Sequence, residues 1–247
     1  MPTRRAVLFV TCIVDQIYPD IGFACIELLE RQSVGVEVIG DLTCCGQMAF
    51  NAGYRDEAQN VARRAIDLLR GRGDVVMPSG SCAAMIRHLY RELFEGTPME
   101  ADAEELRRRT YELTEYLVDI LRVTDVGAQF DGRIAYHHAC HGMRFLGLGA
   151  QAMALLARVR GAEIAPLRES EECCGFGGLF SIKHPAISEA MLARKMHNAE
   201  AAEADVLVTG DASCMTHIAG GLSRRGSTLP VRHIAELLAN RVGAAAR

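Results

Sequence analysis

The segment ELLERQSVGVEVIGDLTCCG, residues 27–46, has a second version in the same chain, ALLARVRGAEIAPLRESEECCG, at residues 154–175. Each version holds a run with helical spacing of apolar residues, a short β-rich run and a loop that ends in Cys-Cys-Gly. A second pair of segments matches further along the chain, GDVVMPSGSCAAMI at 73–86 and ADVLVTGDASCMTHI at 204–218. Because matching elements recur in the same order, the sequence predicts a duplicated unit of about 120 residues.

Within each copy, short apolar runs rich in β-branched residues alternate with amphipathic segments. We expect strands at residues 6–10, 36–40, 74–78, 133–137, 162–166, 205–209 and 229–233. We expect helices at residues 22–32, 53–71, 81–94, 100–125, 149–159, 185–203, 214–222 and 234–242. Such alternation is typical of parallel sheets joined by right-handed crossovers. The sequence therefore predicts an α/β protein of two pseudo-symmetric repeats, each a small parallel β-sheet flanked by helices. The expected repeats span residues 1–127 and 128–247.

The composition narrows the classes of function. Of the 247 residues, 49% are hydrophobic and 23% are charged, which suffices for a buried core. The formal net charge of −4 disfavours a nucleic-acid partner, since such partners select basic surfaces. No apolar run is long enough to span a bilayer, and the N-terminal apolar run ends at Asp15. We interpret that run as a buried first strand and expect a cytoplasmic protein.

Eight of the nine cysteines fall at matching places in the two copies. Each copy has one cysteine after its first strand, an adjacent pair after its second and one after its third. The two sets are Cys12, Cys44, Cys45 and Cys82, and Cys140, Cys173, Cys174 and Cys214. The carboxyl ends of parallel strands meet at one edge of a sheet, so we expect each set to converge there. The ninth, Cys25, lies on the apolar face of an expected helix and is interpreted as a buried structural thiol.

Four convergent thiols in each copy indicate a metal centre. In a cytoplasmic protein, cysteine-rich patterns bind metal or perform redox chemistry more often than they form structural disulfides. Zinc sites usually use close Cys-x-x-Cys pairs, which neither copy contains. Adjacent cysteines point in different directions, which favours different iron atoms of one iron–sulfur cluster. Zinc in one of the two sites, and one cluster instead of two, are alternatives that the residues leave open.

The spacing of the cysteines resembles that of the cysteine-rich CCG domain. The intervals are 31 and 36 residues in the first copy and 32 and 39 in the second. That domain occurs, usually in two copies, in heterodisulfide reductase and in iron–sulfur proteins of glycolate and glycerol-3-phosphate oxidising systems. Over nearly its full length the chain is most similar to the two-copy LutA/YkgE family, lactate utilisation protein A. The matching phrases are VTCIVD (10–15), CCGQMAFNAGY (44–54), PSGSC (78–82), YELTEYLV (111–118), CCGFGG (173–178) and HIAELL (233–238).

The resemblance implies an iron–sulfur-binding electron-transfer component, with a cluster of the 4Fe-4S type, in a multi-protein system that oxidises L-lactate to pyruvate. It implies two further lactate-utilisation proteins as partners, one of them carrying iron–sulfur clusters, and an oxidoreductase component that is not active alone. Two alternatives stay open. One is substrate chemistry directly at the cluster, as the heterodisulfide reductase resemblance allows. The other is a zinc-stabilised scaffold that assembles partner proteins.

One departure from the wider family concerns the last cysteine motif of each copy. That family ends each motif in Cys-x-x-Cys, but the first of those two positions is Ser79 in one copy and Asp211 in the other. Each copy therefore keeps four thiols. Oxygen ligands from Ser79 and Asp211 are one expectation, and a smaller or more labile cluster is the other.

Histidines surround the first cysteine of the second copy only. His137 and His141 match a family H-x-x-C-H pattern around Cys140, whereas the residues around Cys12 include no histidine. We expect the two histidines to tune a cluster through hydrogen bonds or to relay protons. The alternative is a set of hydrogen-bonding histidines near a strand end. The two sites are accordingly expected to differ in role.

Glycines follow both cysteine pairs. Gly46, Gly175, Gly177 and Gly178 are expected to let the backbone approach the cluster closely, with amide groups facing sulfur. The alternative interpretation is a plain flexible turn.

Overall fold

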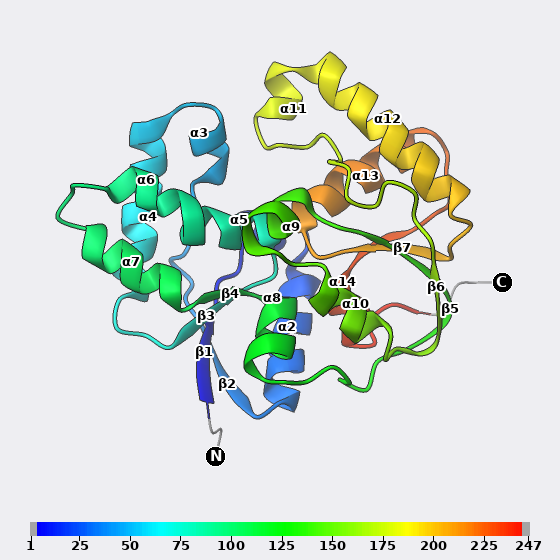
Figure 1. Cartoon of the computed structure of the whole chain (residues 1–247), viewed down its shortest axis with the longest axis horizontal. Helices are drawn as coiled ribbons and strands as arrows, with labels where there is room; N and C mark the ends of the chain where they lie inside the picture. Colours follow the sequence, from blue (N-terminus) through cyan, green and yellow to red (C-terminus); the bar gives the residue numbers. More distant parts are fainter. Residues whose placement is uncertain (1–3, 244–247) are drawn as a thin grey trace.

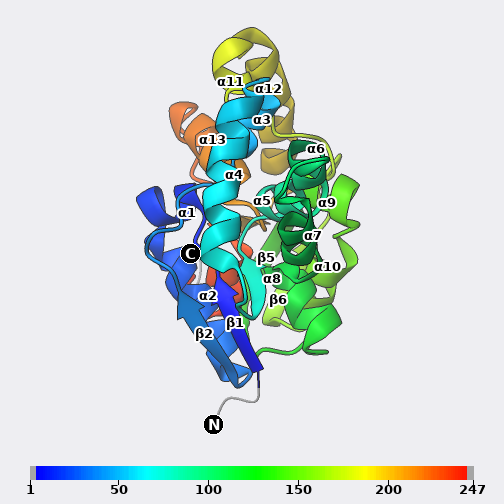
Figure 2. The same cartoon turned by 90° about the vertical axis from the view of Figure 1, so that its left-hand side faces the viewer.

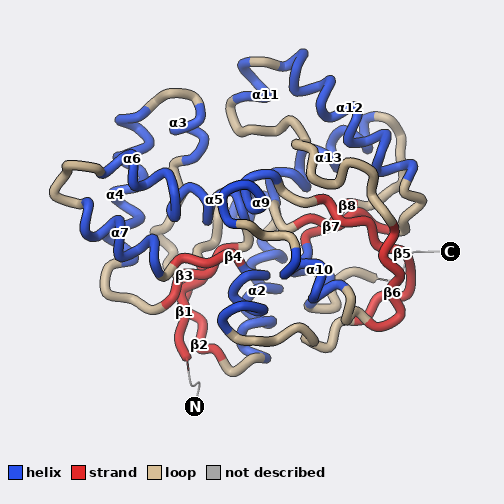
Figure 3. The backbone as a smooth tube through the Cα atoms, in the orientation of Figure 1, coloured by secondary structure: helices blue, strands red, loops and turns tan. Residues whose placement is uncertain are grey.

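The structure is a computed structural model that describes residues 4–243. Its framework is eight strands in the described part of the chain (Figure 1). They are β1 (Arg4–Leu8), β2 (Val34–Val38), β3 (Asp74–Met77), β4 (Thr110–Glu112), β5 (Gln129–His137), β6 (Arg160–Ala165), β7 (Val206–Thr209) and β8 (Val231–His233). They form two four-stranded sheets in the orders β2-β1-β3-β4 and β6-β5-β7-β8, separate groups in Figure 3. Because all six pairings are parallel, the predicted α/β architecture of two similar repeats is confirmed.

Helices flank both sheets. With the first sheet come α1 (Cys12–Ile17), α2 (Pro19–Arg31), α3 (Gln47–Asn51), α4 (Arg55–Leu69), α5 (Gly80–Ala84), η1 (Met85–Leu89), α6 (Tyr90–Phe94), α7 (Glu100–Arg108), α8 (Leu113–Glu115) and η2 (Tyr116–Ile120). With the second come α9 (Cys140–Leu146), α10 (Ala150–Leu156), α11 (Phe180–Lys183), α12 (Pro185–Ala201), α13 (Ala212–Arg224) and α14 (Ile234–Leu238). We call residues 4–127 the first half and 128–243 the second; the domain boundary at 127 stays a prediction.

The expected continuous helix over residues 100–125 is wrong. The helix α7 ends at Arg108, and β4 then pairs with β3 as the edge strand of the first sheet. Thr110 and Tyr111 have side chains that favour extended backbone, and the sheet edge supplies hydrogen bonds that a helix would otherwise provide. A strand of three residues is too short to register as an alternating pattern, so the helical spacing on both sides concealed it.

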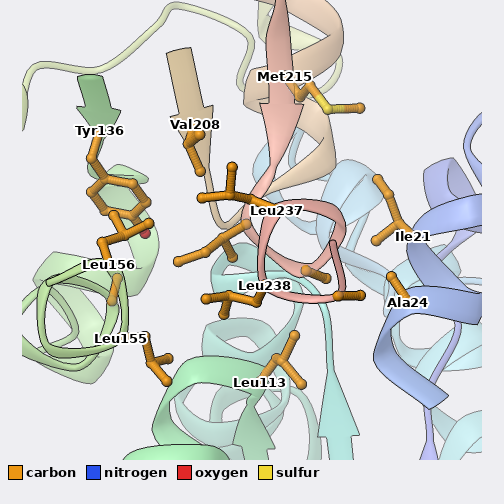
Figure 4. Close-up of a cluster of buried hydrophobic side chains, with 14 of the residues drawn as sticks. Ile21, Ala24, Leu113, Tyr136, Leu155, Leu156, Val208, Met215, Leu237 and Leu238 are labelled. Atoms are coloured by element: carbon orange, nitrogen blue, oxygen red, sulfur yellow. The ribbon is translucent and has the colours of Figure 1, made fainter. Parts of the chain in front are cut away.

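The two halves share one hydrophobic core, shown in Figure 4. The labelled side chains are Ile21, Ala24 and Leu113 from the first half and Tyr136, Leu155, Leu156, Val208, Met215, Leu237 and Leu238 from the second. The helix that follows the last strand of each half packs on the other half, since α14 lies against α2 and α8 against α10. Burial of this apolar surface, at about 25 cal/mol per Å², therefore fixes the halves against each other.

The carboxyl ends of both sheets point toward the middle of the molecule. The short helix α5 follows β3 and packs against α9, which follows β5; α13, which follows β7, packs against α1, which follows β1. In Figure 2, α3 of the first half lies at the same end of the molecule as α11 and α12 of the second. The loops after the strands of the two sheets are thereby brought face to face.

Between residues 4 and 243, no helix combines the length and the apolar character needed to cross a membrane.

Candidate metal centre

The structure brings the four thiols of each set into contact. Cys12 and Cys140 begin α1 and α9, and Sγ of Cys12 lies 3.8 Å from Sγ of Cys44. In the second half, Sγ of Cys174 lies 3.4 Å from Sγ of Cys214. Two thiolates on one tetrahedral metal, at about 2.3 Å each, are about 3.8 Å apart. All nine cysteines are free thiols, so the spacing of these sulfurs suits a shared metal.

Both sets open into one cavity of about 80 Å³. All eight cysteines line it, together with Thr11, Ile13, Gln47, Met48, Asn51, Ser79, Ser81, Ala139, His141, Phe176, Gly177, Gly178, Asp211, Ala212 and Ser213. The sequence predicted one cluster of thiols at the edge of each sheet. It did not predict that the two edges would face each other, because no local pattern reports how two sheets pack.

Within the first set, one thiol is much more acidic than its neighbours. The pKa of Cys44 is lowered to about 3, chiefly by a hydrogen bond from Cys12 and then by one from Cys45. The backbone N–H of Gly46 also donates to Sγ of Cys44, at 3.4 Å. The pKa values of Cys12 and Cys45 are raised, first by their contact with Cys44 and then by other groups and burial. Cys44 is thus the thiolate of this group, and Cys12 and Cys45 retain protons that a bound metal would displace.

The second set repeats this arrangement. The pKa of Cys173 is lowered to about 2, chiefly by a hydrogen bond from Cys140 and then by one from Cys174. The N–H of Gly175 donates to Sγ of Cys173 at 3.4 Å. The pKa values of Cys140 and Cys174 are raised, with the contact to Cys173 as the first cause. Cys173 is therefore the counterpart of Cys44.

The glycine after each cysteine pair has a geometric role. Gly46 and Gly175 have φ values of 87° and 91°, which disfavour any residue with a Cβ. A Cβ on Gly46 would lie 3.1 Å from the carbonyl oxygen of Ala58, and one on Gly175 would lie 2.7 Å from that of Ser188. Because glycine has no Cβ, the cysteine loop can lie close against the following long helix while the glycine amide donates to sulfur.

The other two predicted glycines, Gly177 and Gly178, line the cavity at the boundary between the halves. A Cβ on Gly178 would lie 3.0 Å from Cγ of Met48 in α3. Gly178 thus permits close approach of the first half to the second, a role for which the sequence offered no signal.

Ser79 and Asp211 bond to each other across the two halves. The Oγ of Ser79 donates to Oδ2 of Asp211 at 3.1 Å, and the two residues form an isolated antiparallel bridge. The same Oδ2 accepts from the Ser81 amide at 2.9 Å, while Oδ1 accepts from the Ser213 amide and hydroxyl at 3.1 and 2.5 Å. Each residue also caps its own helix, because Ser79 Oγ accepts from the Cys82 amide at 3.2 Å.

Four donors fill the acceptor sites of the Asp211 carboxylate, which is 1% exposed. This favours a role in holding the halves together. Metal ligation by Ser79 or Asp211 stays a prediction, and it requires one of these hydrogen bonds to be given up.

The two predicted histidines lie at different depths. His141 lines the cavity with its Nδ1 3.6 Å from Sγ of Cys140, and its ring stacks on Phe145. His137 is fully buried below the thiols, where burial lowers its pKa to about 3. Its Nδ1 lies 3.1 Å from the carbonyl oxygen of Ser170. Its Nε2 has no hydrogen-bond partner among the described residues. A ring nitrogen of His137 and the Sγ atoms of Cys174 and Cys214 all lie within 4.8 Å of one another.

Two buried polar residues near this site were missed from the sequence. Lys195 is completely buried in α12, and its amine donates to the carbonyl of Glu169 at 2.5 Å. Burial lowers the pKa of Lys195, while the nearby Cys174 and Cys214 act in the opposite direction. Thr209 ends β7 beside His137 on β5, and its buried Oγ1 has no partner in the described part of the chain. A lysine beside Met196 on the buried face of an expected helix was the available signal.

Cys25 lies outside both thiol sets, as expected. It is buried on α2 within the shared core, and burial raises its pKa.

Comparison with known proteins supports the duplication independently. The model of the CCG cysteine-rich domain family matches residues 6–87 and 134–219, one match in each half. Among solved structures, glutamate racemase isoform RacE1 from Bacillus anthracis matches with a TM-score of 0.33 and 12% identity. That match covers 98% of this chain and 80% of the other.

Curated relatives match along almost the whole chain. "Lactate utilization protein A" of Geobacillus kaustophilus (strain HTA426) is 46% identical, covering 94% of this chain and 97% of that protein. The protein of the same name from Shouchella clausii (strain KSM-K16) is 45% identical over the same shares of both chains. That of Bacillus pumilus (strain SAFR-032) is 43% identical, covering 95% of this chain and 98% of that protein. The chain therefore belongs to the lactate utilization protein A family and carries two copies of the CCG cysteine-rich domain.

Proposed function

We propose that this chain is an iron–sulfur-binding electron-transfer component of a multi-protein system that oxidises L-lactate to pyruvate. The observation that carries the proposal is the pair of four-thiol sets at equivalent positions, both opening into one cavity. Four cysteine thiolates are the usual ligands of an iron–sulfur cluster. The donor chemistry and the contacts between sulfurs therefore fit such a group in each half.

The residues of the chain would do three things at these sites. Cys44 and Cys173, as the most acidic thiols, offer the first thiolate to an incoming metal. The amides of Gly46 and Gly175 donate to sulfur, which stabilises negative charge there. A bound cluster would supply one-electron transfer, which no side chain of this protein provides by itself.

The assignment to lactate rests on the relatives, which are named lactate utilization protein A. Oxidation of lactate to pyruvate releases two electrons and two protons, so a carrier of electrons needs partners that bind the substrate. We propose two further lactate-utilisation proteins as these partners, one of them carrying iron–sulfur clusters.

The test of the metal centre is analysis of anaerobically purified chain for iron, zinc and acid-labile sulfide, joined to electron paramagnetic resonance. Iron and sulfide in similar amounts, with a cluster signal, support the proposal. Stoichiometric zinc without sulfide in both halves would overturn it in favour of a scaffold that assembles partners. The ratio of iron to protein also decides between one cluster and two and reports whether the type is 4Fe-4S.

A second candidate is substrate chemistry directly between the two sites. The shared cavity favours it, because Gln47 and Asn51 supply amide groups beside the apolar Met48 and Phe176. Mixing the loaded chain alone with lactate and an artificial electron acceptor discriminates the two functions. Turnover by the single chain supports the second candidate, whereas turnover only after the partners are added supports the carrier.

A further inference from the structure

We propose that Nε2 of His137 is a metal ligand together with Sγ of Cys174 and Cys214, so that the second half binds its metal through imidazole and thiolate groups. This inference rests on the proposed function, since it requires a metal centre in the second half. It goes beyond the roles expected from the sequence, which were hydrogen bonding and proton relay.

The three donor atoms lie close enough together to bind one metal ion after a small adjustment. They all lie within 4.8 Å of one another, and the two sulfurs are 3.4 Å apart. Thiolate and imidazole on a tetrahedral metal, at about 2.3 and 2.0 Å, place neighbouring donors roughly 3.5–3.8 Å apart. All three residues are buried. Small movements of side chains suffice to close the geometry.

Hydrogen bonding fixes which ring nitrogen faces the thiols. The carbonyl of Ser170, 3.1 Å from Nδ1 of His137, can only accept, so Nδ1 carries the proton and Nε2 presents its lone pair. The same carbonyl accepts from the backbone N–H of His138 at 3.1 Å, which holds it in place. A backbone carbonyl on the other ring nitrogen is the usual support of a metal-binding histidine.

The unsatisfied Nε2 is itself an argument for a ligand. A buried acceptor without a partner is costly to a folded protein, so each such atom calls for an explanation such as a bound ion. Neither sulfur is within hydrogen-bond reach of Nε2 among the described residues, so an S–H donor does not satisfy it.

The first half provides no such donor. Three residues before Cys12 stands Phe9, and three residues before Cys140 stands His137. His141 serves as an internal control, because its Nδ1 lies 3.6 Å from Sγ of Cys140 in a hydrogen-bonding position. Two histidines near one centre thus differ in what they contact.

The test uses full-length chain loaded anaerobically, labelled with ¹⁵N-histidine, in a Cys45→Ala background that removes the first-half set. Pulsed electron paramagnetic resonance reports nitrogen bound to iron, and X-ray absorption at the edge of the bound metal reports imidazole for iron or zinc. We expect one strongly coupled imidazole nitrogen. His137→Phe should abolish it and speed metal loss to a chelator about tenfold or more, whereas His141→Phe should retain it.

His137→Cys provides a matched variant that keeps a ligand at the position. It should hold the metal and lose the nitrogen signal, with circular dichroism showing that each variant is folded. Metal bound without an imidazole nitrogen, or a signal that survives His137→Phe, overturns the inference and leaves the proposed function standing. No metal in the otherwise unsubstituted chain overturns the proposed function itself.

Discussion

The two halves have the same strand order and the same arrangement of thiols, yet they differ directly beneath those thiols. By position relative to the cysteines, Phe9 and Met77 of the first half correspond to His137 and Thr209 of the second. Phe9 and Met77 are completely buried in an apolar cluster. In the second half, the corresponding positions carry two buried polar atoms without partners among the described residues.

The long helix behind each cysteine pair shows the same contrast. Gly46 packs on Ala58 and Gly175 on Ser188, which makes Ala65 of α4 the counterpart of Lys195 of α12. Burying an ammonium and an imidazole costs free energy that alanine and phenylalanine do not cost. Both halves therefore share the same arrangement of thiols, and only the second half has polar residues beneath them. We infer that the second half has chemistry that the first lacks.

Removal of one thiol from each half tests whether the halves bind metal independently. Cys174→Ala should eliminate the second-half centre and Cys45→Ala the first, each leaving about half of the metal, because each set contacts only its own thiols. Metal analysis and absorption spectra of the two variants measure this. Loss of all metal in either variant would show one centre shared across the cavity. If Cys174→Ala lost no metal, Cys174 would not be a ligand.

The Ser79–Asp211 contact tests how the halves are held together. Asp211→Ala leaves four donors without their acceptor and should lower the free energy of unfolding by about 3–5 kcal/mol. Ser79→Ala should cost only about 1 kcal/mol, since it removes one cap and one cross-half bond. Denaturant unfolding of the metal-free, reduced chain measures both, with Asp211→Asn as the matched control. Equal losses of unfolding free energy in Asp211→Ala and Ser79→Ala would contradict the larger role of Asp211.

Glu112 and His233 end the fourth strands of the two sheets, and burial shifts their pKa values in opposite directions. Burial raises the pKa of Glu112 from 4.5 to about 7, so its stabilisation is complete below pH 4.5 and lost as the pH rises through 7. Burial lowers the pKa of His233 from 6.5 to about 4, so its stabilisation is complete above pH 6.5 and lost as the pH falls through 4.

Replacement of Glu112 by Gln should therefore make the chain more stable than the parent by about 3 kcal/mol at pH 8, at about 1.4 kcal/mol per pH unit. At pH 4.5 the two should be equally stable. Denaturant midpoints from pH 4 to 8 measure this, and His233→Gln should flatten only the acidic part of the curve. A parent chain whose stability is unchanged between pH 5 and 8 would contradict the role of Glu112.

Lys195 should affect the second half only, and by the smallest amount. Its ammonium lies near Cys174 and Cys214, and positive charge favours the more reduced state of a neighbouring centre. Lys195→Met should lower the midpoint potential of the second-half centre by tens of millivolts and leave that of the first-half centre unchanged. If the midpoint potential of the first-half centre shifted instead, the assignment of the Lys195 charge to the second half would be wrong.

The pattern of the sequence was sufficient for most strands and for the sets of thiols, because strand–helix alternation and cysteine spacing are local signals. It failed at Thr110–Glu112, where a three-residue strand interrupts helical residues. It also missed Lys195 and Thr209, whose importance depends on burial beside residues distant in the chain. Nothing local marked Gly178 as the point where Met48 of the other half comes close.

The sequence by itself determined that this protein is a duplicated α/β chain with four thiols in each copy, since repetition and spacing are written along the chain. The tertiary structure alone decided that both sets face one cavity, and that Ser79 and Asp211 bond across the halves. It alone also decided that His137 lies beside the thiols of Cys174 and Cys214. The reason is that contacts between distant segments depend on how two sheets pack, and packing follows from the shared core rather than from any single motif.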